Sequence, residues 1–211
     1  RYKTGTVDFG LTEEQKFLVE RVERFVKDRI APRAAQYDLA IEAPAEDVQD
    51  LHQEGWLVAN LDRKRGGLGY GLHGEDPLAF FLLVESLAYG NPSTAHCLQV
   101  HNNTLMMIGS IGTDEQVARW IEPTVKRRAL LPGCSAEPHG TAPSTATRIE
   151  GGFLVSGTKH YATNATLAEW FWIGSVGFEG QPRQLMFMVH KDTPGLKIDA
   201  EVWRPIGMRA V

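Results

Sequence analysis

The N-terminal part of the chain carries apolar residues three and four positions apart, a spacing that places them on one face of an α-helix. From Leu11 onward these residues are Leu18, Val22, Phe25, Val26 and Ile30. Thr12 and Gln15 match a capping box, in which the side chain of each residue accepts a hydrogen bond from the backbone N–H of the other. Pro32 is expected to end this helix, because the residue before a proline avoids helical backbone angles.

The same period predicts four further helices before residue 130. Their ranges are 45–54, 76–89, 93–109 and 113–128. Helix-breaking residues separate them, including Gly55 and the Gly-Asn-Pro sequence at 90–92. Thr113 and Gln116 match a second capping box at the start of the last helix.

After about residue 130 the helical period gives way to short runs of β-branched and aromatic residues, which favour strands. These runs lie at 150–157, 170–176 and 184–190. In the run at 150–157, the apolar residues from Phe153 onward follow a turn at Gly151-Gly152, so this run is expected to form one arm of a hairpin. We therefore predict an α+β chain. An all-helical N-terminal domain, residues 1–130, is expected to precede a mostly antiparallel β-barrel or sandwich domain, residues 131–211.

Composition and charge narrow the functional classes. The 211 residues are 43% hydrophobic and 23% charged with a net charge of −4, which argues against nucleic-acid binding and against binding to anionic lipid, because both need a basic face. The longest nearly apolar run, 77–84, is less than half of the roughly 20 residues of a membrane span, so no membrane insertion is expected. Cys97 and Cys134 are too few for a disulfide framework, and no signal peptide precedes them, which favours a cytoplasmic location.

Three motif-like patterns carry little functional weight. Residues 69–74 match G-x-G-x-x-G, but a polar segment precedes them where a dinucleotide site needs a buried strand. Residues 133–137 resemble a nucleophile elbow whose closing glycine is replaced by Glu137, which disfavours a serine hydrolase. His96 and His101 are separated by roughly 140° around a helix, so they are not predicted to share a metal ion.

Six short segments provide a more specific signal, because they occur together in one order. They are Leu11-Thr12-Glu13-Glu14-Gln15, Arg65-Gly66-Gly67-Leu68-Gly69, Gly112-Thr113-Asp114-Glu115-Gln116, Glu137-Pro138, Gly157-Thr158-Lys159-His160-Tyr161-Ala162-Thr163-Asn164-Ala165 and Pro205-Ile206-Gly207-Met208-Arg209. Together they resemble the acyl-CoA dehydrogenase family, from about residue 8 to residue 211. The fifth segment is the most specific, since it follows the family pattern G-x-K-x-[WY]-x-T-N-[AG].

The resemblance implies an N-terminal helical domain, a middle β domain and a C-terminal four-helix bundle, with FAD bound between the last two. The family's catalytic glutamate lies in the C-terminal bundle, so no residue of this chain is assigned a catalytic role. We expect a fragment of a flavoenzyme that dehydrogenates an acyl-CoA thioester and passes electrons to an electron-transfer flavoprotein or to oxygen. The fragment alone is expected to be inactive and to hold little FAD, whereas the full-length protein is expected to form a homo-oligomer.

The cofactor-binding residues that the resemblance implies lie in two segments. They are Gly133, Ser135, Ala136, Thr141 and Ala142 in the first segment, and Tyr161, Ala162 and Thr163 in the second. Tyr161 would lie against the isoalloxazine ring and Thr163 at its polar edge. From spacing alone, these two residues are equally consistent with a buried cross-strand tyrosine and a strand threonine. Glu137 is interpreted as a structural residue rather than as a general base.

The first segment departs from the family pattern at two positions. The family usually has a threonine where this chain has Ala136, and a serine where it has Ala142. Each lost hydroxyl is expected to cost about 1–3 kcal/mol of binding free energy, unless Ser135, Thr141 or Ser144 replaces it. Two alternatives therefore stay open: a flavin-dependent monooxygenase or oxidase on the same fold, and a non-catalytic paralogue.

Overall fold

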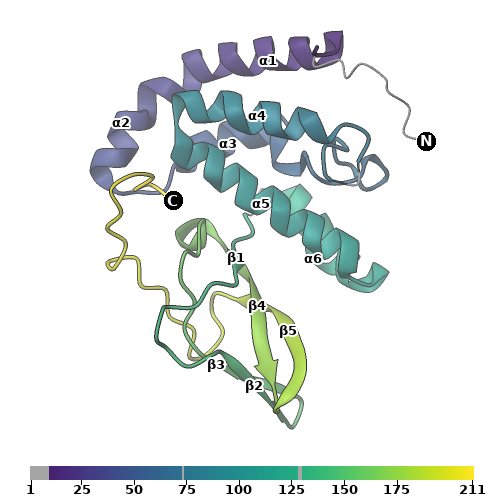
Figure 1. Ribbon diagram of the computed structural model, residues 1–211, viewed down its shortest axis with the longest axis vertical. Helices are drawn as coiled ribbons and strands as arrows, with labels where there is room; N and C mark the ends of the chain where they lie inside the picture. The colour runs from purple at the N-terminus through teal and green to yellow at the C-terminus, as the bar shows by residue number, and fades with distance from the viewer. Residues whose placement is uncertain (1–9, 73, 128–129) are drawn as a thin grey trace, which may run out of the picture.

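The protein consists of a helical part, drawn in the upper half of Figure 1, and a β part, drawn below it. The computed structural model describes residues 10–72, 74–127 and 130–211. The helices α1 to α6 all precede the strands β1 to β5. This order confirms the predicted α+β class. Within these ranges, no helix has both the length and the apolar character needed to cross a membrane.

The first predicted helix continues past Pro32. Helix α1 (Glu13–Phe25) begins with the predicted capping box, in which the Gln15 N–H donates to the Thr12 hydroxyl at 3.2 Å and the Thr12 N–H donates to the Gln15 side chain at 3.0 Å. A π-helical turn (Val26–Ile30) then leads into α2 (Ala31–Ala40). Pro32 lies in the first turn of α2, directly after the π-helical turn, and the helix continues through it, so the prediction that Pro32 ends the helix was wrong.

The remaining helices lie close to their predicted ranges. They are α3 (Ala45–Gln53), α4 (Pro77–Gly90), α5 (Pro92–Ile111) and α6 (Asp114–Arg127), with short 3-10 turns at Trp56–Val58 and Arg63–Arg65. Thr113 and Gln116 form the second capping box, with N···O distances of 3.0 and 3.3 Å. Residue 128, the predicted end of the last helix, lies outside the described residues.

The inward faces of α1, α3, α4 and α5 form the helical core. Its fully buried side chains include Val22, Ile30, Leu51, Leu83 and Leu98. Trp56 is 1% exposed and meets Phe25 edge to face, with ring centroids 4.9 Å apart. Burial of each such side chain contributes about 1.5–3 kcal/mol, so this core is the main support of α5, the helix nearest to the sheet.

Two buried polar side chains connect α5 to other segments. Asp47 of α3 is fully buried, lies 2.8 Å from Arg33 Nε of α2, and accepts a hydrogen bond from the Thr94 hydroxyl of α5. His101 of α5 is 1% exposed, and its Nδ1 accepts the Leu131 N–H at 3.0 Å. Because Leu131 lies just before the first strand, His101 sets the point at which the β part leaves the helices.

The β part is one mixed sheet of five strands. They are β1 (Gly133–Cys134), β2 (Thr145–Ile149), β3 (Gly152–Ser156), β4 (Trp170–Phe178) and β5 (Gln181–His190). Strand β4 pairs antiparallel with β5 along one edge and parallel with both β1 and β2 along the other. Strands β2 and β3 form the predicted hairpin.

The sheet is mostly antiparallel, as predicted, through the β2–β3 and β4–β5 pairs, but it is not closed into the predicted barrel or sandwich: it is open over the described residues, and β1 and β2 each pair in parallel with β4. The physical reason is the path of the chain between β1 and β2. Residues 135–144 leave one edge of β4 and rejoin the same edge without reversing direction. Two consecutive strands therefore run parallel to β4, where a meander would have placed an antiparallel pair.

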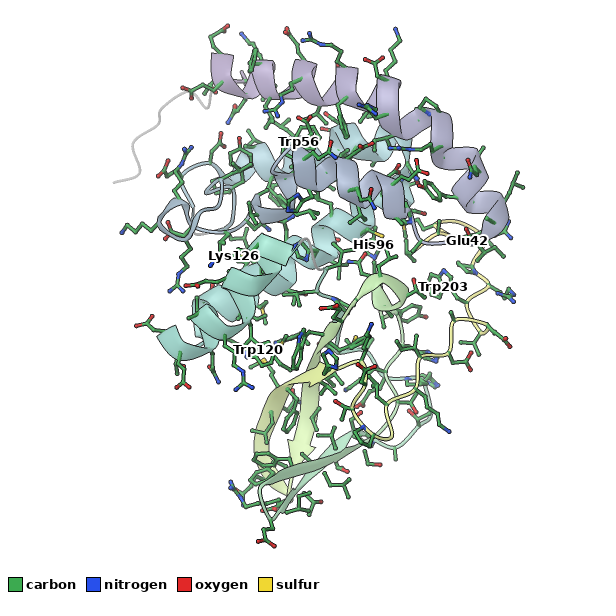
Figure 2. All side chains as sticks on the ribbon, turned by 180° about the vertical axis from the view of Figure 1, so that it is seen from behind. Glu42, Trp56, His96, Trp120, Lys126 and Trp203 are labelled. Carbon is green, nitrogen blue, oxygen red and sulfur yellow. The ribbon has the colours of Figure 1, made fainter. Side chains whose placement is uncertain are left out.

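Aromatic and polar contacts hold the sheet against α5 and α6. Trp120 of α6 meets Trp170 of β4 at 4.3 Å, and Trp170 meets His190 of β5 at 4.7 Å between ring centroids. Figure 2 shows Trp120 between α6 and the sheet. The side-chain Nδ2 of Asn164 donates to the Cys97 carbonyl of α5 at 3.0 Å. The loops of the sheet are thereby fixed relative to the helices.

The residues after β5 return to the helical part. Figure 1 shows this C-terminal segment running from the sheet towards α2. Arg209 Nη1 lies 3.8 Å from Asp38 Oδ2 of α2, and Ala210 is 2% exposed. Trp203 lies on this path, as labelled in Figure 2.

Candidate functional site

The first predicted segment forms a loop at one edge of β4. Strand β1 ends at Cys134 and β2 begins at Thr145, and both pair with that edge. We call residues 135–144, which lie between them, the excursion loop. Strand β4 has an irregular register opposite the loop, and Ser175 there has a φ of 53°. The loop therefore spans a bulge, a feature that often redirects backbone near functional sites.

Glu137 fastens the two ends of the excursion loop. Its Oε1 accepts the Ser144 N–H at 2.6 Å and the Lys159 ammonium at 2.8 Å. The bond from Lys159, together with that from the Ser144 N–H, lowers the pKa of Glu137 to about 2. A carboxylate with so low a pKa is a weak general base at neutral pH, which agrees with the interpretation of Glu137 as a structural residue.

Lys159 holds the excursion loop against the sheet. Besides Glu137, its Nζ donates to the Ser135 carbonyl at 3.3 Å and to the Ser175 carbonyl at 3.2 Å. The side chain is only 9% exposed. An ammonium group has three N–H donors and no acceptor, so these three partners use its full hydrogen-bonding capacity.

The second predicted segment lies beside the first. The His160 N–H donates to the Ala136 carbonyl at 2.8 Å, which places the residues after His160 next to the start of the excursion loop. Tyr161 has a φ of 56°, which few residues other than glycine adopt, and its side chain is 69% exposed. Trp203 of the C-terminal segment meets the Tyr161 ring edge to face, with centroids 6.0 Å apart. The arrangement presents an accessible aromatic ring beside the loop.

Thr163 and Asn164 lie beneath the surface, where the sheet meets α5. They are 4% and 0% exposed. Asn164 has a φ of 74°, and its side chain bonds the backbone of α5 at Cys97. Two non-glycine residues with positive φ, Tyr161 and Asn164, thus lie three positions apart. Such backbone persists only where tertiary contacts hold it, and it is frequent at functional sites.

The predicted cofactor-binding residues differ in accessibility. Ala136, Thr141, Ala142 and Tyr161 are exposed, Gly133, Ser135 and Ala162 are half-buried, and Thr163 is buried. Gly133 packs closely on α5, because a Cβ atom at this position would lie 3.0 Å from Thr104 Oγ1. The backbone bond to Ala136 brings 133–136 and 161–163 together, whereas Thr141 and Ala142 lie further along the loop.

The three hydroxyls that were expected to replace the missing side chains differ in accessibility: Ser144 is buried, Ser135 is half-buried and Thr141 is exposed. Thr141 Oγ1 donates to the Pro138 carbonyl at 2.8 Å, within the loop itself. Ser144 is 2% exposed, and its buried hydroxyl makes no hydrogen bond within the described residues. The Ser135 hydroxyl lies against β4. Of these three hydroxyls, Thr141 is therefore the one at the surface of the excursion loop.

The sequence patterns did not single out Lys159, although it stands in the most specific family segment. Its three acceptors come from residues 16, 22 and 24 positions earlier or later in the chain. The sequence could have indicated this ion pair, since one of the six family segments contains a lysine and another contains Glu137. Buried charges usually occur in opposite pairs.

Cysteine and metal chemistry receive no support at this site. Cys134 is buried next to the excursion loop, and burial raises the pKa of its thiol to about 11, so it stays protonated at neutral pH. Over residues 10–72, 74–127 and 130–211, no group of three or more histidine, cysteine or acidic side chains is arranged to hold a metal ion.

Gly157→Ala is expected to reduce the free energy of unfolding by about 2 kcal/mol, because the new methyl group overlaps the end of the excursion loop. A Cβ atom at Gly157, where φ is 146°, would lie 2.3 Å from Ser144 Oγ and 2.7 Å from Ser144 Cα. Gly151→Ala is the matched control, since its φ is 78° but nothing lies within 4 Å of the added atom. Urea unfolding of both variants measures the difference. Equal losses would show that the contact with Ser144 has no effect on stability.

Comparison with known proteins places the whole described chain in one family. Residues 12–128 match the family model for the acyl-CoA dehydrogenase N-terminal domain, and residues 132–211 match the model for the acyl-CoA dehydrogenase middle domain. Benzylmalonyl-CoA dehydrogenase of Aromatoleum aromaticum is 29% identical over 205 residues, which cover 93% of this chain and 52% of that protein. The chain thus spans about half the length of the curated relatives it matches.

Solved structures show the same fold. Butyryl-CoA dehydrogenase from Megasphaera elsdenii superposes with a TM-score of 0.76 at 24% identity, covering 90% of this chain and 51% of that one. A glutaryl-CoA dehydrogenase from Mycobacterium smegmatis in complex with FADH2 superposes with a TM-score of 0.79 at 22% identity, covering 95% and 51% respectively.

Proposed function

The chain belongs to the acyl-CoA dehydrogenase family, and we propose that it forms one wall of an FAD site in a flavoenzyme that oxidises an acyl-CoA thioester between its α and β carbons. One observation carries the proposal: the hydrogen bond from His160 N to Ala136 O sets the exposed Tyr161 ring beside the excursion loop. The ring would pack on the isoalloxazine, and the loop would bind the polar groups of the cofactor.

The residues at the site fit a flavin. Tyr161 offers an accessible aromatic face, and Thr163, two residues further along the same segment, carries a hydroxyl but is only 4% exposed. A pyrophosphate is repelled by unpaired carboxylates, and the Lys159 ammonium neutralises Glu137 at 2.8 Å. Backbone N–H groups of the excursion loop, together with the exposed Thr141, would bind the phosphates, as backbone N–H groups do in other anion-binding loops.

The chain's share of the reaction is binding and orientation. Bound FAD would supply the acceptor for the hydride that leaves the β carbon of the thioester. Removal of the α proton needs a base, and we assign that base to no residue of this chain, because the carboxylate nearest the site, Glu137, is held in an ion pair. Tyr161 and Thr163 would instead fix the ring, and Trp203 would support Tyr161 from behind.

The proposal extends to domains and partners. We propose residues 1–130 as a helical domain and 131–211 as a β domain, since α6 ends at Arg127 and β1 begins at Gly133. For the full-length protein we propose an acyl-CoA substrate, an electron-transfer flavoprotein or oxygen as electron acceptor, self-association into a homo-oligomer, and a cytoplasmic location.

A second candidate function is a flavin-dependent monooxygenase or oxidase on the same fold. The exposed methyl groups of Ala136 and Ala142 favour it, because they stand where the family usually has hydroxyls that serve the flavin and the thioester. A protein of this type would reduce oxygen with its flavin and would show no preference for CoA thioesters.

The test is the visible flavin spectrum of the purified full-length protein, recorded without oxygen before and after addition of acyl-CoA thioesters of several chain lengths. We expect bound FAD that is bleached by at least one thioester. Tyr161→Leu is expected to weaken FAD binding about tenfold through loss of the ring contact. Tyr89→Leu, which changes an 86% exposed tyrosine on α4, is the control and should bind FAD normally.

The outcomes separate the candidates. Bound flavin that no thioester bleaches, but that consumes oxygen when reduced, would favour the monooxygenase or oxidase. Absence of any bound flavin would refute both enzymatic proposals and favour a non-catalytic paralogue.

A further inference from the structure

We propose that Lys159 is a positioning residue of the flavin site, which holds the excursion loop and the Tyr161 segment in one arrangement; this inference rests on the proposed function. Lys159 itself is nearly buried and is not placed against the cofactor. Its effect would be transmitted through the two segments that it joins.

Three acceptors surround the Lys159 ammonium. Glu137 and Ser135 belong to the excursion loop, and Ser175 belongs to the bulge of β4. One cation therefore connects the start of the loop to the irregular part of the strand that the loop crosses. A bulged strand offers no regular ladder to hold the loop there, so the lysine takes the place of backbone pairing.

Lys159 directly precedes His160 and Tyr161 in the chain. The next residue, His160, donates its N–H to Ala136, between two of the residues that the lysine side chain binds. Tyr161 then follows in its unusual backbone conformation. The side chain of Lys159 and the backbone of His160 thus bind the same three loop residues, 135–137. A shift of the loop would therefore also move Tyr161.

Removal of the Lys159 charge would affect all three of its acceptors. Without the ammonium, the Glu137 carboxylate would keep its bond from the Ser144 N–H but lose its counter-ion, and the two carbonyls at 3.2 and 3.3 Å from Lys159 Nζ would lose this donor. Charge-assisted hydrogen bonds are about twice as strong as neutral ones. A negatively charged, loosened loop would then face the cofactor phosphates.

The experiment uses the full-length protein with three substitutions: Lys159→Met, Lys159→Arg and Lys191→Met. Lys159→Met is expected to weaken FAD binding about tenfold or more. Lys159→Arg keeps the charge and several donors and is expected to restore binding to within about threefold of wild type. Lys191→Met makes the same chemical change at an exposed position of the same domain and should bind FAD like wild type.

Two further readouts separate positioning from general stability. At saturating FAD, Lys159→Met should shift the midpoint potential of the bound flavin, and Lys159→Arg should return it, because the contacts to the ring are displaced and then restored. Hydrogen exchange at the Ser144 amide should be faster in Lys159→Met, on the order of tenfold, because its acceptor Glu137 is no longer anchored.

The results distinguish this inference from the proposed function. If wild type binds no flavin but Lys159→Met still releases the Ser144 amide, the proposed function and the positioning role both fail, and the lysine remains only a structural clamp. If wild type binds FAD and Lys159→Met changes melting temperature alone, with affinity and potential unchanged, the proposed function stands and the positioning role is refuted.

Discussion

Asp47→Ala is expected to lower the free energy of unfolding by about 3 kcal/mol, because the carboxylate joins three helices in a site without water access. Asp47 of α3 is 0% exposed. It pairs with Arg33 of α2 at 2.8 Å and accepts hydrogen bonds from Thr94 and Asn91 at the start of α5. Its removal takes the acceptor from three donors, Arg33 Nε, Thr94 and Asn91, and leaves a cavity between the helices.

Glu46→Ala provides the matched control for Asp47. Glu46 is the adjacent residue in α3 and bonds the same Arg33 at 3.2 Å, but its side chain is 71% exposed. Exposed ion pairs contribute about 0–1 kcal/mol, so this variant should unfold almost like wild type in urea. A loss below about 1 kcal/mol for Asp47→Ala, or equal losses for both variants, would contradict the view that burial makes the Asp47 contacts important.

The helices were predictable because their signals are local. Apolar spacing and the two capping boxes at Thr12 and Thr113 act within a few residues, and the structure confirms both caps. Pro32 was misinterpreted because its effect depends on the turn before it. The π-helical turn Val26–Ile30 absorbs the irregularity and lets the chain continue into α2.

The pairing of the sheet was not predictable from the same kind of signal. The runs at 170–176 and 184–190 were expected to be strands, and they form most of β4 and β5. Which edge each strand joins depends on partners that are distant in sequence, as when Thr145 pairs with Gly177. The sheet is therefore open and mixed, and not the expected barrel or sandwich. The alternation of residues within each strand does not indicate which strands pair with each other.

The candidate site was predictable from the family resemblance more than from physical patterns. Tyr161 and Thr163 stay predictions as cofactor contacts, since spacing alone left their roles open. The clamp between Lys159 and Glu137 could only be found in three dimensions, because its three acceptors are supplied by the excursion loop and by the bulge of β4. The residues that hold this site in place are thus less visible in the sequence than those expected to bind the cofactor.

Lowering the pH from 6.5 to 4 is expected to reduce the free energy of unfolding by about 3 kcal/mol through His101 alone. The ring is fully buried, and burial lowers its pKa from 6.5 to about 4, although its bond to the Leu57 backbone opposes this shift. Between these two values the unfolded chain binds a proton that the folded chain does not, so stability falls as the pH falls. Below about pH 4 both states are protonated, and His101 contributes no further loss.

The neutral form of His101 has a structural task that explains this sensitivity. Its unprotonated Nδ1 accepts the Leu131 N–H at 3.0 Å, and a protonated ring would present a donor to that donor. His101→Gln keeps an acceptor and a donor but does not titrate, so it should abolish this part of the pH dependence. His139→Gln, at an exposed loop position, should leave the dependence intact.

Urea unfolding of the wild type and both variants at several pH values between 6.5 and 4 measures the slopes. Burial also lowers the pKa of His96, so a smaller slope of the same sign should remain in His101→Gln. A wild-type slope that survives unchanged in His101→Gln would mean that other groups bind the protons. In that case protonation of His101, and the loss of its bond from Leu131, would not explain why acid lowers the free energy of unfolding.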